Sequence, residues 1–225
     1  VADAKTTAVE EHLRDVFTSI YEGMRTIARL PGVRSLSRHA ENLDDNARRT
    51  IQEIYNNLAT DVAMSEVYIV PLDLDPEAKD PVTGELQAPS ITFDQLIVGR
   101  SADEHEAAGA EGEGPEEIEI FEYRLMRRQL AWMREHVPRQ SDVHGLAVPA
   151  LTGPEVITCD NRRFHPSAPD DRDRSGLVYS VPFYGTDGDL RGAVSGVVLS
   201  AALRDLLPDA RFALRNVADD FTIAW

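Results

Sequence analysis

The acidic residues between positions 73 and 84 have types and spacing that could bind a cation. A calcium loop of the EF-hand kind needs acids at alternate positions, a glycine at the sixth and a bidentate Glu at the twelfth. Pro76 and Ala78 interrupt that spacing in this run. We therefore favour a solvated acidic loop over a calcium site.

Zinc binding and nucleophilic catalysis have no matching motif in the sequence. The six histidines are scattered, without an HExxH pair or a cluster of cysteines. The chain also has no Gly-x-Ser-x-Gly elbow and no glycine-rich phosphate loop. Cys159 precedes Asp160 and Asn161 as in a thiol site, but nothing local would activate its sulfur, which favours a buried structural thiol. We predict no catalytic residue, no metal site, no cofactor and no enzymatic activity.

A pocket for a small molecule is the chemistry that remains, because aromatic rings with a few convergent polar groups can form one. The candidate lining residues are Tyr68, Tyr123, Arg127, Trp132, Asp160, Asn161, Tyr179, Ser180 and Tyr184. Strand alternation places Tyr179 on one face, and Ser180 and Tyr184 on the other. For each residue alone we favour the rim of an ordinary core, and for Arg127 with Arg128 we favour a solvated helix face over a carboxylate clamp.

The strand that carries Tyr179 belongs to the clearest unit of the sequence. Residues 177–184 are rich in Val, Tyr and Phe, residues 185–188 tolerate turn dihedrals, and residues 193–199 are apolar and β-branched. A short amphipathic helix then begins at Ser200 and ends before Pro208. This pattern predicts a β-hairpin that leads into a helix.

Two long helices are predicted before this unit. Apolar residues recur at steps of three and four over residues 9–28, and Pro31 breaks this helix. The same spacing predicts a helix over residues 43–62, with Asn42 or Asp44 as its N-cap. Both helices have a polar opposite face, which is more typical of a helical hairpin, a dimer seam or a stalk than of a site of chemistry.

The segments between these units predict a mixed fold. Residues 66–71 are typical of a strand, residues 91–98 of a strand or short helix, and residues 116–136 of a third helix. Short extended segments follow at 147–151 and 155–159, then a polar loop to residue 175, and the strands 211–217 and 221–225 are expected to complete the sheet. We predict an α+β fold. Its parts are an N-terminal helical pair (1–64) and a sheet (65–225) that includes the third helix.

Length, composition and net charge limit the kinds of partner and crosslink that this chain can have. The chain has 225 residues and a net charge of −16, which disfavours binding to nucleic acid or to an anionic bilayer surface. A single cysteine excludes an intrachain disulfide. The chain begins at Val1 and ends within an expected strand, so we expect it to be a fragment of a longer protein.

The order of these elements resembles the Cache family, the PAS-like extracytoplasmic sensor domains of bacterial signalling proteins. The resemblance covers nearly the whole chain and rests on three segments: FTSIYEGMRTIARLPGVRSL, IYNNLATDVAMSEVYIVP and VYSVPFYGTDGDLRGAVSGVVLSAALRDLL. They resemble the long first helix, the entry into the first strand, and the strand, turn, strand and helix that close the ligand-binding sheet. The Arg-x-Trp-Tyr run of amino-acid-binding members is absent, which argues against an amino-acid ligand.

The resemblance implies a sensor function without catalysis. It implies an extracytoplasmic, periplasmic domain of a membrane-anchored histidine kinase, diguanylate cyclase or chemoreceptor, with a small-molecule ligand and a homodimer through the N-terminal helix. Ligand binding would shift a terminal helix relative to the partner subunit. The alternatives are a dimerisation or interaction module without a ligand and, less favoured, a cytoplasmic enzyme.

Overall fold

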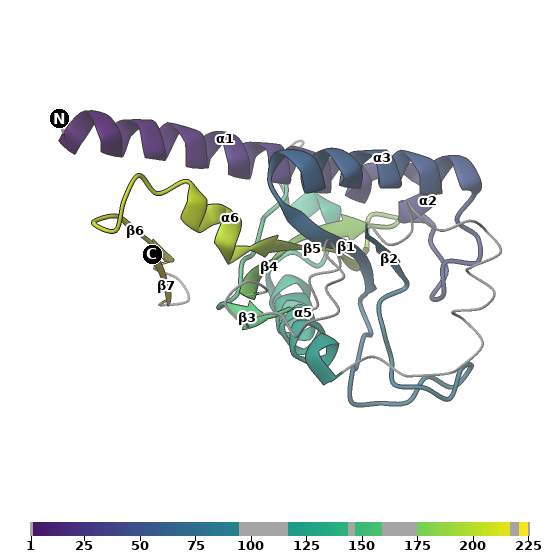
Figure 1. The fold of residues 1–225 in the computed structure, drawn as a ribbon. Coiled ribbons are helices and arrows are strands. Elements are labelled where there is room, and N and C mark those ends of the chain that lie inside the picture. The colour runs from purple at the N-terminus through teal and green to yellow at the C-terminus, as the bar shows by residue number, and fades with distance from the viewer. Residues whose placement is uncertain (1, 95–116, 144–146, 159–174, 217–220, 225) are drawn as a thin grey trace.

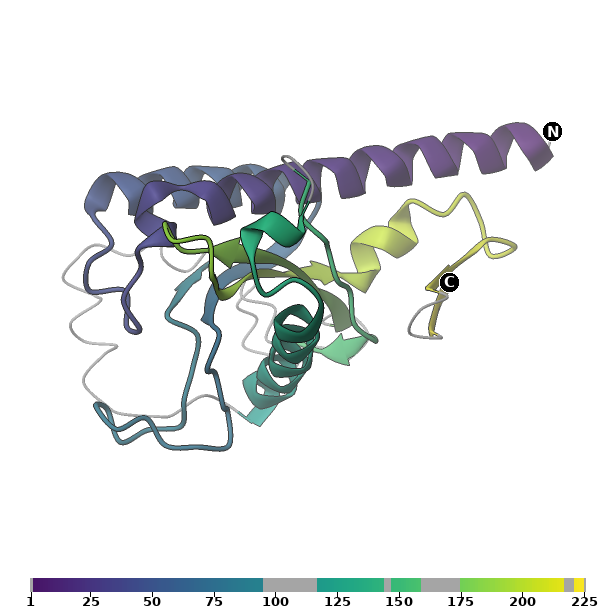
Figure 2. The same cartoon turned by 180° about the vertical axis from the view of Figure 1, so that it is seen from behind.

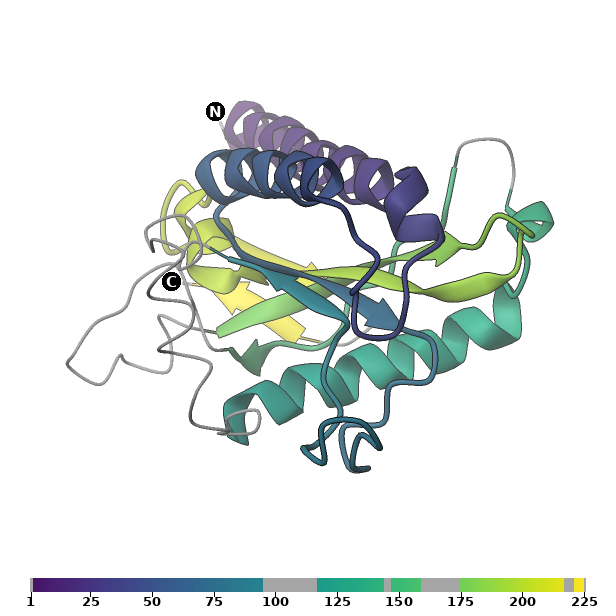
Figure 3. The ribbon, with the colours of Figure 1, turned by 90° about the vertical axis from the view of Figure 1, so that its right-hand side faces the viewer.

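The computed structural model describes residues 2–94, 117–143, 147–158, 175–216 and 221–224. An antiparallel sheet of five strands lies between two helical layers. Helices α1 (Ala2–Arg29) and α3 (Asp45–Asp61) cover one face, and α5 (Glu117–His136) covers the other (Figure 3). The α+β prediction is therefore confirmed, including the long N-terminal helices packed on the sheet.

The strand order of the sheet is β2-β1-β5-β4-β3, and every neighbouring pair is antiparallel. The strands are β1 (Met64–Pro71), β2 (Ile91–Phe93), β3 (Val156–Ile157), β4 (Ser175–Tyr184) and β5 (Leu190–Leu199). The predicted hairpin is β4 and β5, and its turn includes Gly188 at φ +83°. This positive φ suits glycine, which has no Cβ to clash. The sheet is compatible with a PAS-like fold.

The helices of the N-terminal layer begin and end at residues that favour helix ends. Pro31 stands at the start of the short helix α2 (Pro31–Arg34), so the break after α1 is immediately followed by a new helical turn. Asp44 caps α3 by accepting a hydrogen bond from the backbone N–H of Ala47 at 2.8 Å. Of the two predicted caps, Asp44 is therefore the one used.

Each face of the sheet has its own hydrophobic core. The core beneath α1 and α3 includes Ile20, Met24 and Ile27 of α1, all fully buried. The core beneath α5 includes Met126 and Met133. Two aromatic residues predicted near the apolar face of α5, Phe121 and Trp132, instead lie on its exposed side.

The C-terminal segment departs from the predicted arrangement. Helix α6 (Ser200–Asp205) follows β5 directly, as predicted. Strands β6 (Ala213–Asn216) and β7 (Phe221–Ala224) pair with each other as a separate two-stranded sheet, so they do not complete the central sheet. The loop between α6 and β6 approaches α1, where Lys5 Nζ is 3.9 Å from Asp209 Oδ2 (Figures 1 and 2).

Several predictions concern residues outside the described part of the chain. These are the thiol of Cys159, the candidates Asp160 and Asn161, residues 95–98 of the segment predicted over 91–98, and the polar loop before residue 175. In the described residues, no helix is both long enough and apolar enough to cross a membrane.

Candidate ligand-binding face

A row of polar side chains crosses the face of the sheet that α5 covers. Tyr68 of β1 pairs in register with Ser195 of β5, and Ser195 pairs with Ser180 of β4. Residues in register on adjacent antiparallel strands project from the same face. Both serines are fully buried, so hydroxyl groups occupy the centre of a layer that would otherwise be apolar.

Gln129 of α5 completes the hydrogen bonds of the two serines. Its Nε2 donates to the carbonyl oxygen of Val178 at 2.9 Å, and its Oε1 accepts from Ser180 Oγ at 2.7 Å. The Oγ atoms of Ser180 and Ser195 are 2.6 Å apart. Since a hydroxyl has one proton and Ser180 gives its own to Gln129, Ser195 donates to Ser180. Ser195, Ser180, Gln129 and the carbonyl oxygen of Val178 therefore form a directed chain of hydrogen bonds.

The other end of the row joins a tyrosine to a buried carboxyl group. Tyr68 Oη donates to Glu122 Oε2 of α5 at 2.8 Å, and Glu122 is fully buried. The ring of Tyr123 meets the ring of Tyr68 edge to face, with centroids 5.9 Å apart. Tyr68 and Tyr123, both predicted site residues, are therefore brought together.

Two further polar residues are fully buried in or next to the strands of the sheet. Glu66 lies on β1 within the register shift between Met64 and Val67, and it accepts a hydrogen bond from Ser65 Oγ at 2.6 Å. Thr158 follows β3. A buried carboxyl group is costly unless it is compensated, so Glu122 makes the α5 face chemically distinct from a packing surface.

Tyr184 closes the far end of the same face. Its hydroxyl donates to the carbonyl oxygen of Val137 at 2.9 Å, just beyond the end of α5. Burial, with a smaller contribution from the charge of Asp142, raises the pKa of Tyr184 to about 12. The hydroxyl is therefore a proton donor at neutral pH.

The structure removes Tyr179 from the predicted site. It lies on the opposite face, beneath α1, where its ring is 6.2 Å from the ring of Phe17. Burial, then the neighbouring Tyr21, raises its pKa above the ordinary value for tyrosine. The predicted alternation of Tyr179 with Ser180 and Tyr184 is confirmed, but it is this alternation that removes Tyr179 from the α5 face.

The structure also removes Arg127 and Trp132 from the predicted site, because both side chains point away from the sheet. Arg127 Nη1 pairs with Asp75 Oδ1 at 2.9 Å on the exposed side of α5, so the predicted solvated face is confirmed. Trp132 is 38% exposed and stacks on His136 with ring centroids 4.3 Å apart. Neither residue touches the polar row.

Sequence reasoning missed Glu66, Glu122, Gln129 and Ser195. The signal for two of them was present, since Glu122 and Gln129 are seven residues apart and fall on the apolar stripe of α5. Polar residues on an otherwise apolar stripe indicate a buried polar contact. Ser195 likewise interrupts the apolar run of β5.

The groups of the polar row are fully buried or nearly so, and they form hydrogen bonds with one another and with α5. Among the described residues, no group of three or more His, Cys, Asp or Glu side chains could hold a metal ion. No family model matches the chain, and neither a curated protein nor a solved structure is significantly similar to it. Function is therefore argued from the fold and from these side chains.

Proposed function

We propose that this chain is a non-catalytic ligand-sensing domain, similar to Cache domains, that binds a small molecule on the α5 face of its sheet. The polar row formed by Tyr68, Ser195, Ser180 and Gln129 is the observation that carries the proposal. A sheet face that only stabilised the fold could be packed with apolar residues, whereas a buried network of hydrogen bonds favours one arrangement of α5 on the sheet.

The expected mechanism follows from the position of α5. A ligand can shift a conformational equilibrium only through its different affinities for the two states. A molecule that binds the hydroxyl groups of Ser180 and Tyr68 would replace the hydrogen bonds that these groups make with Gln129 and Glu122. Helix α5 would then move relative to the sheet. In the parent protein, proposed to be membrane-anchored with this domain in the periplasm, that movement would reach the terminal helices.

Thermal unfolding in the presence of a metabolite library tests the proposal. A ligand at about 100 times its Kd should add about 2.7 kcal/mol to the free energy of unfolding. Tyr68→Phe removes a hydroxyl from the α5 face and should weaken binding, whereas Tyr179→Phe makes the same change on the opposite face and should leave binding unchanged. Equal effects of the two variants, or a library with no binder, would contradict the proposal.

The second candidate is a dimerisation or interaction module without a ligand. It is supported by the completeness of the hydrogen bonds that Gln129, Ser180 and Tyr68 make with other residues of the chain. Such a module would dimerise through α1, whether or not any metabolite is present.

Disulfide crosslinking along α1 separates the two candidates. Single cysteines at exposed positions, such as Thr18→Cys and Glu22→Cys, would be introduced in a Cys159→Ser background. A sensor should show crosslinking that changes when the ligand is added, and an interaction module should show one fixed pattern. Absence of any crosslink at positions throughout residues 9–28 would contradict a homodimer through this helix.

A further inference from the structure

The connection between β1 and β2, residues 72–90, has a fixed internal structure. Lys79 and Leu86 form a β-bridge, and the backbone N–H of Asp80 donates to the carbonyl oxygen of Glu85 at 2.7 Å. Farther along, Gln87 N–H donates to the carbonyl oxygen of Ala78 at 3.0 Å. These contacts make the connection a small hairpin, which we call the β1–β2 loop, whose parts would move together.

One side of the β1–β2 loop is held by arginines of α5. Arg124 Nε is 3.2 Å from Glu77 Oε1, and Arg127 Nη1 is 2.9 Å from Asp75 Oδ1. In addition, Arg134 Nη2 donates to the carbonyl oxygen of Leu72 at 2.9 Å. The loop is therefore attached to the outer side of α5 at three points.

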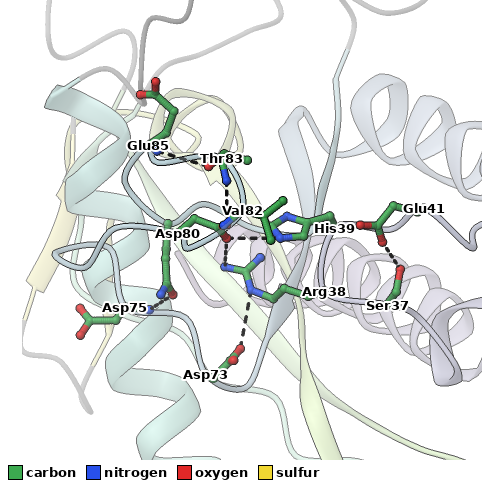
Figure 4. Close-up of polar contacts among 11 residues, drawn as sticks. Ser37, Arg38, His39, Glu41, Asp73, Asp75, Asp80, Val82, Thr83 and Glu85 are labelled. Atoms are coloured by element: carbon green, nitrogen blue, oxygen red, sulfur yellow. Dashed lines mark hydrogen bonds and ion pairs between the residues drawn. The ribbon is translucent and has the colours of Figure 1, made fainter.

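The other side of the loop is held by the segment between α2 and α3. Asp80 is only 5% exposed, and its Oδ1 accepts hydrogen bonds from the backbone N–H groups of Val82 and Thr83 at 2.8 and 3.2 Å. Its Oδ2 is 3.4 Å from His39 Nε2 and 4.0 Å from Arg38 Nη2 (Figure 4). The Asp80 carboxylate is therefore held by two hydrogen bonds from its own loop, and its ion pairs with His39 and Arg38 attach the loop to residues 38 and 39.

Charged side chains surround His39. Asp80 faces it from the β1–β2 loop, and Glu41 faces it from its own segment, while Arg38 lies next to it and pairs with Asp73 Oδ1 at 3.8 Å. Burial opposes ionisation of Asp80, yet the bonds from Val82 and Thr83 and then the charges of His39 and Arg38 hold the pKa of Asp80 below its ordinary value.

We propose that the β1–β2 loop is an ionic bridge that couples the position of α5 to the α2–α3 segment. The inference goes beyond ligand sensing, because it needs no ligand. The exposed pairs of Arg124 and Arg127 are individually weak, so the coupling depends on the stiffness of the loop and on the Asp80 anchor. The bridge would pass movement from the layer on one face of the sheet to the layer on the other.

Hydrogen exchange of the whole chain tests this bridge, with rates corrected for the intrinsic pH dependence of exchange. Asp80→Asn should increase the exchange rate about threefold or more in the loop and also in residues 124–134 of α5. Arg139→Gln is the matched control, since it removes the exposed Arg139–Asp189 pair, which is 3.3 Å long, at the other end of α5. It should leave exchange in the β1–β2 loop unchanged.

A second variant tests the same anchor from its other side. His39→Gln removes the imidazole whose Nε2 is 3.4 Å from Asp80 Oδ2. It should increase the exchange rate in the β1–β2 loop and in residues 124–134 of α5, as Asp80→Asn does. Faster exchange confined to the loop and to residues 37–41, with α5 unchanged in both tests, would overturn the proposal.

Discussion

The two faces of the central sheet differ in chemistry, and the larger hydrophobic core lies beneath α1 and α3. Beneath α1 and α3 the inward residues are apolar, with Ile20, Met24 and Ile27 fully buried against the strands. Beneath α5, hydroxyl, amide and carboxyl groups occupy the middle of the interface. The same strands supply both faces, since alternate residues point to opposite sides.

This difference teaches that the two layers respond differently to disturbance. Apolar packing is non-directional and tolerates small shifts, whereas a chain of hydrogen bonds has one preferred arrangement and is costly when partly broken. The α1 and α3 layer therefore accounts for stability, and the α5 layer is the one in which a change of hydrogen-bond partner could be detected.

The largest expected effect is a truncation on the apolar face. Ile27→Ala leaves a cavity in a closely packed core and should lower the free energy of unfolding by about 2–5 kcal/mol, measured by urea denaturation. Val82→Ala, at a position 75% exposed, is the control and should change it by less than about 0.5 kcal/mol. A loss for Ile27→Ala no greater than that of the control would contradict the assignment of stability to this face.

A smaller effect is expected from removing one polar group beneath α5. Gln129→Leu keeps the side-chain volume roughly constant but leaves the Ser180 hydroxyl without its acceptor, which should cost about 1–3 kcal/mol in the same assay. The matched variant combines Gln129→Leu with Ser180→Ala and Ser195→Ala. It should recover most of the loss, since no buried hydroxyl then lacks a partner.

If the losses of unfolding free energy added up in the triple variant, they would contradict the difference between the two faces. They would mean that each side chain contributes independently through packing, as on the apolar face. Recovery would instead establish that Gln129 and the two serines act as one unit, which is the property that the proposed sensor requires.

Most of the fold could be predicted from the sequence because its elements have strong local signals. Apolar periodicity placed α1, α3 and α5, and the turn at residues 185–188 placed the hairpin. The pairing of β6 with β7 could not be predicted in this way. Local patterns identify a strand but not its partner, so the assignment of residues 211–225 to the central sheet was wrong.

The candidate site was predicted only where strand alternation was sufficient. Alternation placed Ser180 and Tyr184 on a face separate from Tyr179, and the structure confirms it. The contribution of α5 was harder to predict, because the rotation of a helix about its axis depends on which side chains the sheet accepts. Glu122 and Gln129 were therefore missed, and the aromatic Trp132 was wrongly placed in the site.

The smallest expected effect compares one chemical change on the two faces of the same strand. At neutral pH, Tyr184→Phe should cost about 0.5–1.5 kcal/mol of unfolding free energy, because Val137 loses a buried hydrogen-bond donor. Tyr179→Phe should cost less, since no described residue forms a hydrogen bond with the Tyr179 hydroxyl. A larger loss of unfolding free energy for Tyr179→Phe would contradict the assignment of the specific polar contacts to the α5 face.

Alkaline unfolding gives the same pair of variants a second readout. Burial raises the folded-state pKa of Tyr184 from 10 to about 12, so the unfolded chain releases this proton before the folded chain does. Its contribution to stability is complete below pH 10 and is lost as the pH rises to about 12. Tyr184→Phe should therefore lessen the fall in unfolding free energy across that window. The pKa of Tyr179 is also raised, so Tyr179→Phe should lessen the alkaline fall in unfolding free energy as well. The two faces therefore share the cost of burying a phenol. They differ in whether the phenol donates a hydrogen bond to another described residue, as Tyr184 does to Val137.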